Sequence, residues 1–246
     1  MYHFFILAEQ VEEPVVTVTG NDVNHIKNVL RMKVGERLSV TDEDGVEYKC
    51  EIMSLETAQI KLAIIEKKEV NHELPAKIFL FQGLPKSDKM ELIIQKAVEL
   101  GIYEIIPMET KRCVVRLDDK KKESKNRRWN AVAESAAKQS KRTMIPKVMP
   151  IMKFRDAIQS VRDFDITCIP YEHAEGMQQT KQLLASLRPG AVTAFFIGPE
   201  GGFEEEEIQF AIQNEVQPIS LGKRVLRTET AGMALLSMMM LELECR

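Results

Sequence analysis

Two short segments of the chain combine glycine with charged residues in a pattern that could hold a ligand. The first is Ile197-Gly-Pro-Glu-Gly-Gly-Phe203, which is followed by four glutamates, Glu204 to Glu207. Its glycines can adopt positive φ angles and let a ligand approach the main chain closely. The spacing does not match a phosphate-binding loop, and five carboxylates, counting Glu200, would repel a phosphate. The composition therefore favours a ligand with a positive charge, such as the sulfonium of S-adenosylmethionine, or else a turn with only a structural role.

The second segment is Leu221-Gly-Lys-Arg-Val-Leu-Arg-Thr-Glu-Thr-Ala231, which carries two arginines near a glycine. Arg224 and Arg227 could each bind a carboxylate or an RNA phosphate through two parallel hydrogen bonds. The segment also suits the start of a helix, because Thr228 or Thr230 could cap it and Glu229 would complement its dipole. Both interpretations stay open at this point.

Basic residues are concentrated in the middle of the chain. Residues 111–147 contain thirteen lysines and arginines and four acidic residues, whereas residues 1–72 contain eight basic and thirteen acidic residues. Such a run is either a solvated helix face or a surface for RNA phosphates. Trp129 lies within the run and could stack on a base or anchor the core.

Composition and spacing exclude several classes of protein. Apolar residues make up 44% and charged residues 29% of the chain, which is typical of a folded globular protein and not of a disordered or fibrous one. The four cysteines and four histidines are too scattered for metal-ligand spacing, so no metal is predicted. No apolar run approaches the roughly 18 residues of a membrane span, and the amino terminus lacks the features of a secretory signal. We therefore expect a cytoplasmic protein that does not enter the membrane.

Residues 1–72 have the pattern of a small all-β domain. Strands are predicted at residues 15–19, 37–41, 47–52 and 59–65, with a short helix near residues 22–29. Short strands separated by turn signals suggest a small barrel. Residues 66–75 are polar, lack periodicity and end in proline, which predicts a linker.

Residues 73–246 have the pattern of an α/β domain. The predicted strands (78–82, 103–107, 165–169, 191–197 and 218–221) alternate with predicted helices (86–100, 131–139, 177–187, 204–214 and from 228). This alternation predicts a mainly parallel sheet with helices on both faces. Ligands bind at the carboxyl ends of the strands in such sheets. Both glycine-containing segments follow predicted strands, so we expect them to form the ligand site.

Taken in order, several blocks resemble one known family. They are Gly83-Leu-Pro-Lys-Ser-Asp-Lys-Met-Glu91, Gln95-Lys-Ala-Val-Glu-Leu-Gly101, Glu134-Ser-Ala-Ala-Lys-Gln-Ser-Lys-Arg142 and the two glycine-containing segments, with His25-Ile-Lys-Asn-Val-Leu-Arg-Met-Lys-Val-Gly-Glu36 and Asp44-Gly45 nearer the amino terminus. Together they resemble the signature blocks of the bacterial 16S ribosomal RNA uracil-N3 methyltransferases, the small subunit methyltransferases E of the SPOUT class. The resemblance extends over the whole chain.

The resemblance implies a fold and a cofactor. The fold would be an α/β trefoil-knot methyltransferase domain at residues 73–246, preceded by a PUA-like, RNA-binding β-barrel at residues 1–72, with two copies forming a homodimer. S-adenosylmethionine would bind among the knot loops. The residues expected to bind it are Ile197, Gly198, Pro199, Glu200, Gly201, Gly202, Leu221, Gly222, Val225, Leu226 and Thr230.

The implied reaction is methylation of uridine N3 in the decoding region of 16S ribosomal RNA, as free RNA or in the small ribosomal subunit. Uracil N3 carries a proton, so its removal is the catalytic problem. Arg227 is the candidate for stabilising the resulting negative charge, and Glu200 could accept the proton or contact the cofactor's positive end. The residues expected to contact RNA are Arg31, Lys86, Lys89, Arg112, Arg128, Lys138 and Arg142. The chain has Thr110-Lys-Arg-Cys113 where the family often has Thr-Glu-Arg-Ser, so a polar role at Cys113 is not expected to carry over.

Two other functions compete with this one. A non-catalytic RNA-binding ribosome-assembly factor would explain the predicted barrel and the basic run, but not the two glycine-containing segments. A nicotinamide-dependent oxidoreductase would require a dinucleotide-binding fingerprint followed by an acidic residue about 20 positions later, and the glycine-rich turn does not provide it. The methionine-rich helix from Thr228 could fill the core or form a dimer interface.

Overall fold

The computed structural model describes residues 1–174 and 176–245, and the chain divides into two units. The first unit comprises Met1–Glu73 and Ala137–Met144, and the second comprises Leu74–Ala136 and Ile145–Arg246. The first boundary between the two units, between Glu73 and Leu74, lies one residue from the predicted boundary between residues 72 and 73. The return of residues 137–144 to the first unit is not visible in the sequence pattern.

The first unit is built on one sheet, whose strands within the described residues follow the order β1-β4-β5-β6-β3-β2. The strands are β1 (His3–Phe5), β2 (Val11–Glu12), β3 (Val15–Thr19), β4 (Arg37–Thr41), β5 (Val46–Leu55) and β6 (Gln59–Glu69). β1 pairs parallel with β4, and the other neighbours are antiparallel. β1 and β2 are the two edges of this sheet, so closure into a barrel stays a prediction.

Alternation of side chains places apolar residues of this sheet on one buried face, although β4 is covered on its other face as well. Val16 and Val18 of β3 are at most 1% exposed, and Leu38 and Val40 of β4 are fully buried. The predicted helix near residues 22–29 is present as α1 (Asn21–Asn24), which continues into the π-helical turn His25–Val29. A short 3-10 helix (Ala8–Gln10) precedes β2.

The predicted linker at residues 66–75 is wrong at its start. β6 continues to Glu69, and its last residues pair with the first residues of β5, from Val46 to Lys49. The last part of β6 consists mostly of exposed, charged residues. It therefore shows no apolar alternation, and the sequence pattern does not predict it as a strand.

The second unit contains the predicted parallel sheet. Among the described residues its strands follow the order β10-β8-β7-β12-β11-β13, with β9 paired to β8, and every pair is parallel. The strands are β7 (Lys77–Gly83), β8 (Glu104–Glu109), β9 (Lys147–Val148), β10 (Met152–Lys153), β11 (Ile166–Pro170), β12 (Val192–Ile197) and β13 (Gln217–Ile219). The prediction of a mainly parallel sheet is confirmed.

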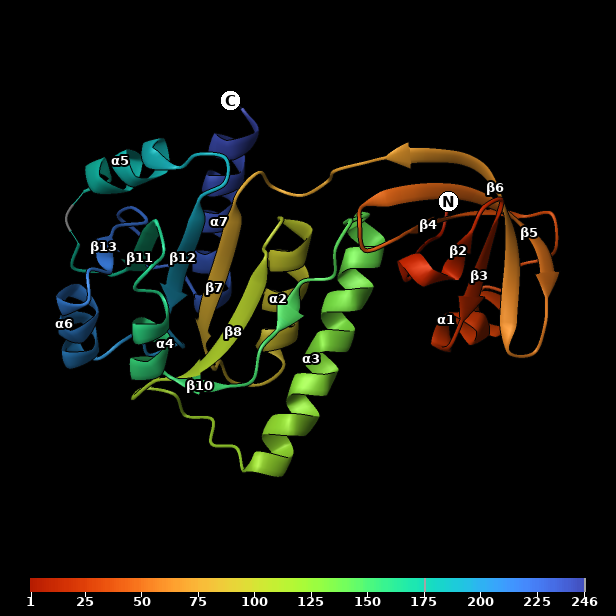
Figure 1. Ribbon diagram of the computed structural model, residues 1–246. Coiled ribbons are helices and arrows are strands. Elements are labelled where there is room, and N and C mark those ends of the chain that lie inside the picture. The colour runs from red at the N-terminus through yellow and green to blue at the C-terminus, as the bar shows by residue number, and fades with distance from the viewer. Residues whose placement is uncertain (175, 246) are drawn as a thin grey trace. The chain divides into compact units, whose positions relative to one another are not determined.

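Helices cover both faces of this sheet, as predicted (Figure 1). They are α2 (Lys89–Glu99), α3 (Asp119–Ser140), α4 (Phe154–Ser160), α5 (Gln178–Ser186), α6 (Glu205–Gln213) and α7 (Thr228–Glu244). Phe196 of β12 shares a core cluster with residues of α4 and α6. The next residue back, Phe195, points to the other face and lies beside Gly232 of α7. α7 also packs against α2 and α5.

The helix predicted at residues 131–139 is much longer, since α3 begins at Asp119. Its first half is a highly charged stretch without apolar periodicity, which is why the pattern missed it. Lysine, arginine and glutamate are nevertheless good helix formers. Trp129 on this helix is 3% exposed, so it anchors the core and is not available to stack on a base. None of the helices in the described residues has the length and hydropathy required to cross a membrane.

Candidate functional site

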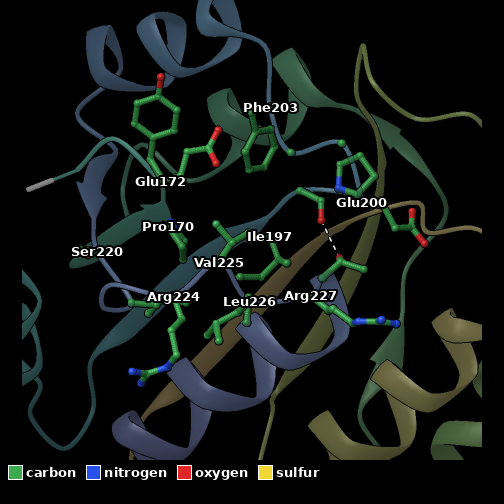
Figure 2. A pocket seen from close by; sticks show the side chains of 18 of the residues that line it. Pro170, Glu172, Ile197, Glu200, Phe203, Ser220, Arg224, Val225, Leu226 and Arg227 are labelled. Atoms are coloured by element: carbon green, nitrogen blue, oxygen red, sulfur yellow. Dashed lines mark hydrogen bonds between the residues drawn. The ribbon is translucent and has the colours of Figure 1, made fainter.

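The loops that leave β11, β12 and β13 meet at the carboxyl end of the sheet and enclose a cavity of about 480 Å³ (Figure 2). This volume lies in the range of small-molecule sites. The start of α7 closes the cavity, and Lys89 and Arg112 reach it from α2 and from the loop after β8. The lining residues include Pro170, Tyr171, Glu172, Ile197 to Phe203, and Ser220 to Thr228 with Ala231. Both glycine-containing segments therefore line one cavity, as expected.

The loop after β12 is packed too tightly for larger residues at several positions. A Cβ atom on Gly83, at the end of β7, would lie 2.7 Å from Cδ of Pro199. A Cβ on Gly198 would lie 3.0 Å from Cα of Gly202, which itself has a φ of +69°. These glycines let the loop fold back on itself and rest directly on the neighbouring strand end.

A buried threonine joins this loop to the start of α7. The hydroxyl of Thr228 donates a hydrogen bond of 2.6 Å to the carbonyl oxygen of Gly198. It accepts one of 2.9 Å from Nε2 of Gln82, whose side chain is fully buried. The N-cap position of α7 is Arg227, and no side chain caps this helix. Thr228 thus holds the β12 loop, which is a different role from the predicted cap.

The five carboxylates near the glycine-rich loop all have partners within the chain. Glu200 pairs with Lys89, Glu204 with Arg112, and Glu206 with Lys111. Glu205 accepts a hydrogen bond from the hydroxyl of Tyr171, and Glu207 accepts from the main-chain amides of Lys111 and Glu204. Basic side chains, a phenol and main-chain amides therefore already compensate these charges, so the carboxylates hold the loops in place and contribute less negative potential to the cavity than their number suggests.

Glu200 is held by the first turn of α2 and the residues just before it. Its carboxylate accepts a hydrogen bond of 3.1 Å from the amide of Lys86 and lies 3.0 Å from Nζ of Lys89. Burial raises the pKa of Glu200, but its own amide, the Lys89 ammonium and the Lys86 amide outweigh this, so the pKa lies below its ordinary value. A carboxylate held in this way is a weak proton acceptor.

Tyr171 is a lining residue that the sequence reasoning missed. Its hydrogen bond to Glu205, together with burial, raises the pKa of Tyr171 to about 12. The hydroxyl is therefore protonated at neutral pH and connects the β11 loop to the start of α6. The sequence could have indicated Tyr171 as a site residue, because it closely follows a predicted strand and ligands bind at strand ends in such sheets.

Arg224, Arg227 and Lys223 carry the remaining positive charge on the cavity. All three are exposed, and within residues 1–174 and 176–245 their side chains make no hydrogen bond or ion pair. In Figure 2 the guanidinium groups of Arg224 and Arg227 point in opposite directions. This side of the cavity can therefore bind an anion or stabilise negative charge.

The structure brings together most residues predicted to bind the cofactor. Thr230 is the exception: it is exposed and does not line the cavity, whereas Thr228 does. In the part of the chain that the structure describes, no cluster of three or more histidine, cysteine or acidic side chains could hold a metal ion.

The residues predicted to contact RNA fall into different environments. Lys86 is exposed beside the cavity, and Arg128 is an exposed residue paired with Glu91. In the first unit, Arg31 is exposed in a turn with a φ of 54°.

Two of the predicted RNA contacts are engaged inside the first unit. Lys138 pairs with Asp22 at 2.8 Å. The Arg142 side chain is 3% exposed and its guanidinium binds Glu73. A buried, paired guanidinium cannot reach a phosphate, so we correct the prediction by leaving Arg142 out of the RNA surface.

Comparison with known proteins shows that this chain is similar to RNA methyltransferases. Residues 72–240 match the model of an RNA methyltransferase domain, and residues 18–65 match that of an RNA methyltransferase PUA domain. A Bacillus subtilis protein named ribosomal RNA small subunit methyltransferase E is 39% identical, over 96% of this chain and 94% of its own.

Solved structures agree with these matches. One described as that of a hypothetical protein has a TM-score of 0.93 and 39% identity, covering 99% of both chains. A ribosomal RNA small subunit methyltransferase E from Neisseria gonorrhoeae, solved bound to S-adenosyl methionine, has a TM-score of 0.83 and 30% identity, covering 96% of this chain and 95% of its own.

Proposed function

Because the chain belongs to the family of ribosomal RNA small subunit methyltransferases E, we propose that it transfers a methyl group from S-adenosylmethionine to 16S ribosomal RNA. We propose further that the methylated atom is N3 of a uridine in the decoding region. The observation that carries the proposal is the single cavity formed by both glycine-containing segments at the carboxyl end of the sheet.

The residues present fit S-adenosylmethionine. The cavity volume of about 480 Å³ suits a nucleoside-sized ligand. The tight turn from Gly198 to Gly202 leaves main-chain groups on the cavity wall, where they can bind an adenine ring without side chains in the way. When bound, this cofactor supplies an electrophilic methyl group on a sulfonium.

The residues of the chain then have to favour loss of the N3 proton. Deprotonated uracil carries negative charge on its two carbonyl oxygens, and a fixed cation nearby stabilises it. Arg227 is exposed at the cavity and has no side-chain partner in the described residues, so it is the side chain we assign to this role. Glu200 is already bound to Lys89 and has a lowered pKa, so we assign it to positioning the loop and the cofactor, with the proton leaving to solvent.

RNA would be bound by exposed cations of both units. Arg31 and Lys86 remain exposed, and the proposed PUA-like unit would provide the first of them. Arg128 is also exposed, but it would have to exchange its partner Glu91 for a phosphate. A stacked or paired target uridine must be turned out of its helix to expose N3, at a cost of a few kcal/mol. Binding should weaken strongly with salt because phosphate contacts release counterions.

The family resemblance also supports a trefoil knot in the second unit and a homodimer. Light scattering of the purified protein tests the dimer. A mass of one chain at micromolar concentration would contradict it.

The decisive experiment is methylation in vitro followed by nucleoside mass spectrometry. Small ribosomal subunits from cells lacking the protein are incubated with the protein and S-adenosylmethionine, and the subunits are then digested. We expect N3-methyluridine from one position of the RNA. A methylated nucleoside of another kind would keep the methyltransferase and reject N3. Absence of both methylation and cofactor binding would favour the assembly factor.

A further inference from the structure

We propose that Arg112 is a positioning residue for the cofactor-binding loop and not a contact for RNA. This inference rests on the proposed function, since it concerns the loop that would bind S-adenosylmethionine. It reassigns a residue that the sequence pattern groups with the basic, RNA-binding run.

The side chain of Arg112 makes two hydrogen bonds and one further ion-pair contact with that loop and the helix after it. Nη1 donates to the carbonyl oxygen of Gly201 at 2.7 Å. Nη2 donates to one carboxylate oxygen of Glu204 at 3.2 Å, and Nε lies 3.0 Å from the other. The planar guanidinium thus binds a carboxylate in a two-point fork while one of its nitrogens also fixes a main-chain carbonyl.

The aliphatic part of the same side chain packs on the loop. A Cβ atom on Gly201 would lie 3.2 Å from Cβ and 3.4 Å from Cδ of Arg112. Gly201 therefore allows the arginine to lie directly over the main chain. Contact and hydrogen bond together leave the Gly201 peptide little freedom to rotate.

The segment that carries Arg112 is itself held in place. The amide of Lys111 donates to Glu207 at 2.9 Å, and the Lys111 ammonium pairs with Glu206. Cys113 is buried, with its sulfur 3.4 Å from the amide nitrogen and 3.3 Å from the hydroxyl of Thr110. The loop after β8 is consequently held in place, and through the contacts of Arg112 it also holds the glycine-rich loop.

Two consequences separate this role from an RNA contact. A loop held before the ligand arrives loses less freedom on binding, so cofactor affinity should depend on Arg112. Its charge is also already compensated by Glu204, so it should release few counterions from RNA. Lysine cannot reproduce the fork, because it offers a single point charge.

The test compares Arg112→Lys, Arg112→Gln and Glu204→Gln with the wild-type protein. Titration calorimetry with S-adenosylmethionine and with S-adenosylhomocysteine gives cofactor affinity. The salt dependence of binding to a fluorescent 16S RNA fragment gives the number of phosphate contacts. Arg188→Lys, which alters an exposed ion pair with Asp165 away from the cavity, is the control for a surface arginine. Arg31→Gln is the control for an exposed, unpaired cation in the proposed RNA surface.

We expect all three variants to bind both ligands about five- to tenfold more weakly, with an unchanged salt slope for RNA. At saturating S-adenosylmethionine kcat should return towards the wild-type value, so the loss lies in KM for the cofactor. The double variant that combines Arg112→Gln with Glu204→Gln should lose little more cofactor affinity than either single variant, because both substitutions remove the same contact. If Arg112→Gln does not fold, the cofactor affinities of Arg112→Lys and Glu204→Gln decide whether Arg112 positions the loop.

A cofactor affinity within twofold of wild type, with a salt slope reduced by about one, would make Arg112 an RNA contact and overturn the inference. An increase of RNA affinity in Glu204→Gln without loss of cofactor binding would overturn it as well. If the wild-type protein binds no S-adenosylmethionine, the proposed function itself fails, and this outcome is distinct from the other two.

Discussion

Charged side chains around the cavity belong to two groups. The carboxylates of Glu200 and of residues 204–207 are bound within the chain, whereas Arg224 and Arg227 are exposed and make no such bond in the described residues. Bound carboxylates fix the loops, and unpaired guanidinium groups remain able to respond to a ligand. Chemistry is therefore expected from the arginines and positioning from the acids.

Replacing Arg227 by alanine should lower kcat about 100-fold while changing the affinity for S-adenosylmethionine by less than threefold. The reason is that a cation at the cavity acts on the negative charge that develops as the N3 proton leaves. Initial rates at saturating cofactor and RNA provide the measurement. Arg162→Ala, which removes an exposed arginine whose guanidinium donates to Asn214, is the matched control and should keep full activity. Equal losses in both variants would refute the role of Arg227.

Replacing Thr228 by valine should destabilise the protein by about 2 kcal/mol. The substitution leaves the Gly198 carbonyl and one donor of Gln82 without a partner, and each unsatisfied buried group costs about 1–3 kcal/mol. Thr228→Ser keeps the hydroxyl and should cost less than about 1 kcal/mol. Urea unfolding measures both differences. Equal stability of the valine and serine variants would show that the hydroxyl contributes nothing.

Single-residue chemistry was only partly visible in the sequence. The two segments that line the cavity could be predicted, because glycine and arginine after a strand indicate a site. The contact between Gln82 and Thr228 joins positions 146 residues apart, and no local pattern reports it. Equally, the sequence shows acidic and basic runs but not that Glu204 and Arg112 neutralise each other.

Strand ends and loops around the cavity fit together with little free space. Gly83 ends β7 directly beneath Pro199, and Gly232 brings α7 close to β12. Only the first of these contacts is too short for a methyl group. The two glycines therefore provide a matched pair for testing how tightly the loop is held.

Gly83→Ala should destabilise the protein by about 1–3 kcal/mol and weaken cofactor binding, because its Cβ would lie 2.7 Å from Pro199 Cδ and 2.8 Å from its nitrogen. Gly232→Ala should be neutral or stabilising by up to about 1 kcal/mol. Its Cβ would lie 3.6 Å from Ile197 Cγ1, an ordinary contact, and alanine favours the helix. Thermal unfolding and calorimetry give both values. A neutral Gly83→Ala would mean that the loop can move away.

Most of the longer helices and strands were predicted close to their observed ranges, including the acidic helix α6, whereas α4 and the exposed, charged parts of α3 and β6 were missed. β7, α2 and β12 lie close to their predicted ranges because each buries a regular set of side chains. The first half of α3 and the end of β6 are exposed and charged, so burial leaves no pattern in them. The alternation of strands and helices predicts that the strands are parallel. A knot forms only when one segment of the chain passes through a loop made by another, and hydrophobic periodicity carries no information about this. The knot therefore stays a prediction from the family resemblance.

In the molecule as a whole, the ion pair between Glu73 and Arg142 joins the two stretches of chain that make up the first unit. Glu73 accepts hydrogen bonds from the Arg142 guanidinium, from the amide of Thr143 at 2.8 Å and from the amide of Met144 at 3.2 Å. It thereby ties the end of one chain segment of the unit to the other.

Stability should fall in acid partly through Glu73. Burial raises the pKa of Glu73, but the hydrogen bond and charge of Arg142 and the bonds from Thr143 outweigh it, so the folded pKa is lowered from the ordinary 4.5. The stabilisation is therefore complete above pH 4.5 and is lost as the pH falls towards the folded pKa. The free energy of unfolding of wild type and Glu73→Gln, measured between pH 3 and 7, should differ most at about pH 7 and converge in acid. A constant difference across this range would contradict the assignment.

The first unit is made of two stretches separated by more than sixty residues, Met1–Glu73 and Ala137–Met144. A protein fragment ending at residue 72 would lack both Glu73 and its arginine. Recombination between relatives at a single point near residue 73 would join a first stretch from one parent to a second stretch from the other. Exchange of this unit during evolution therefore demands matching substitutions in both stretches, and chimeras should carry residues 137–144 along with it.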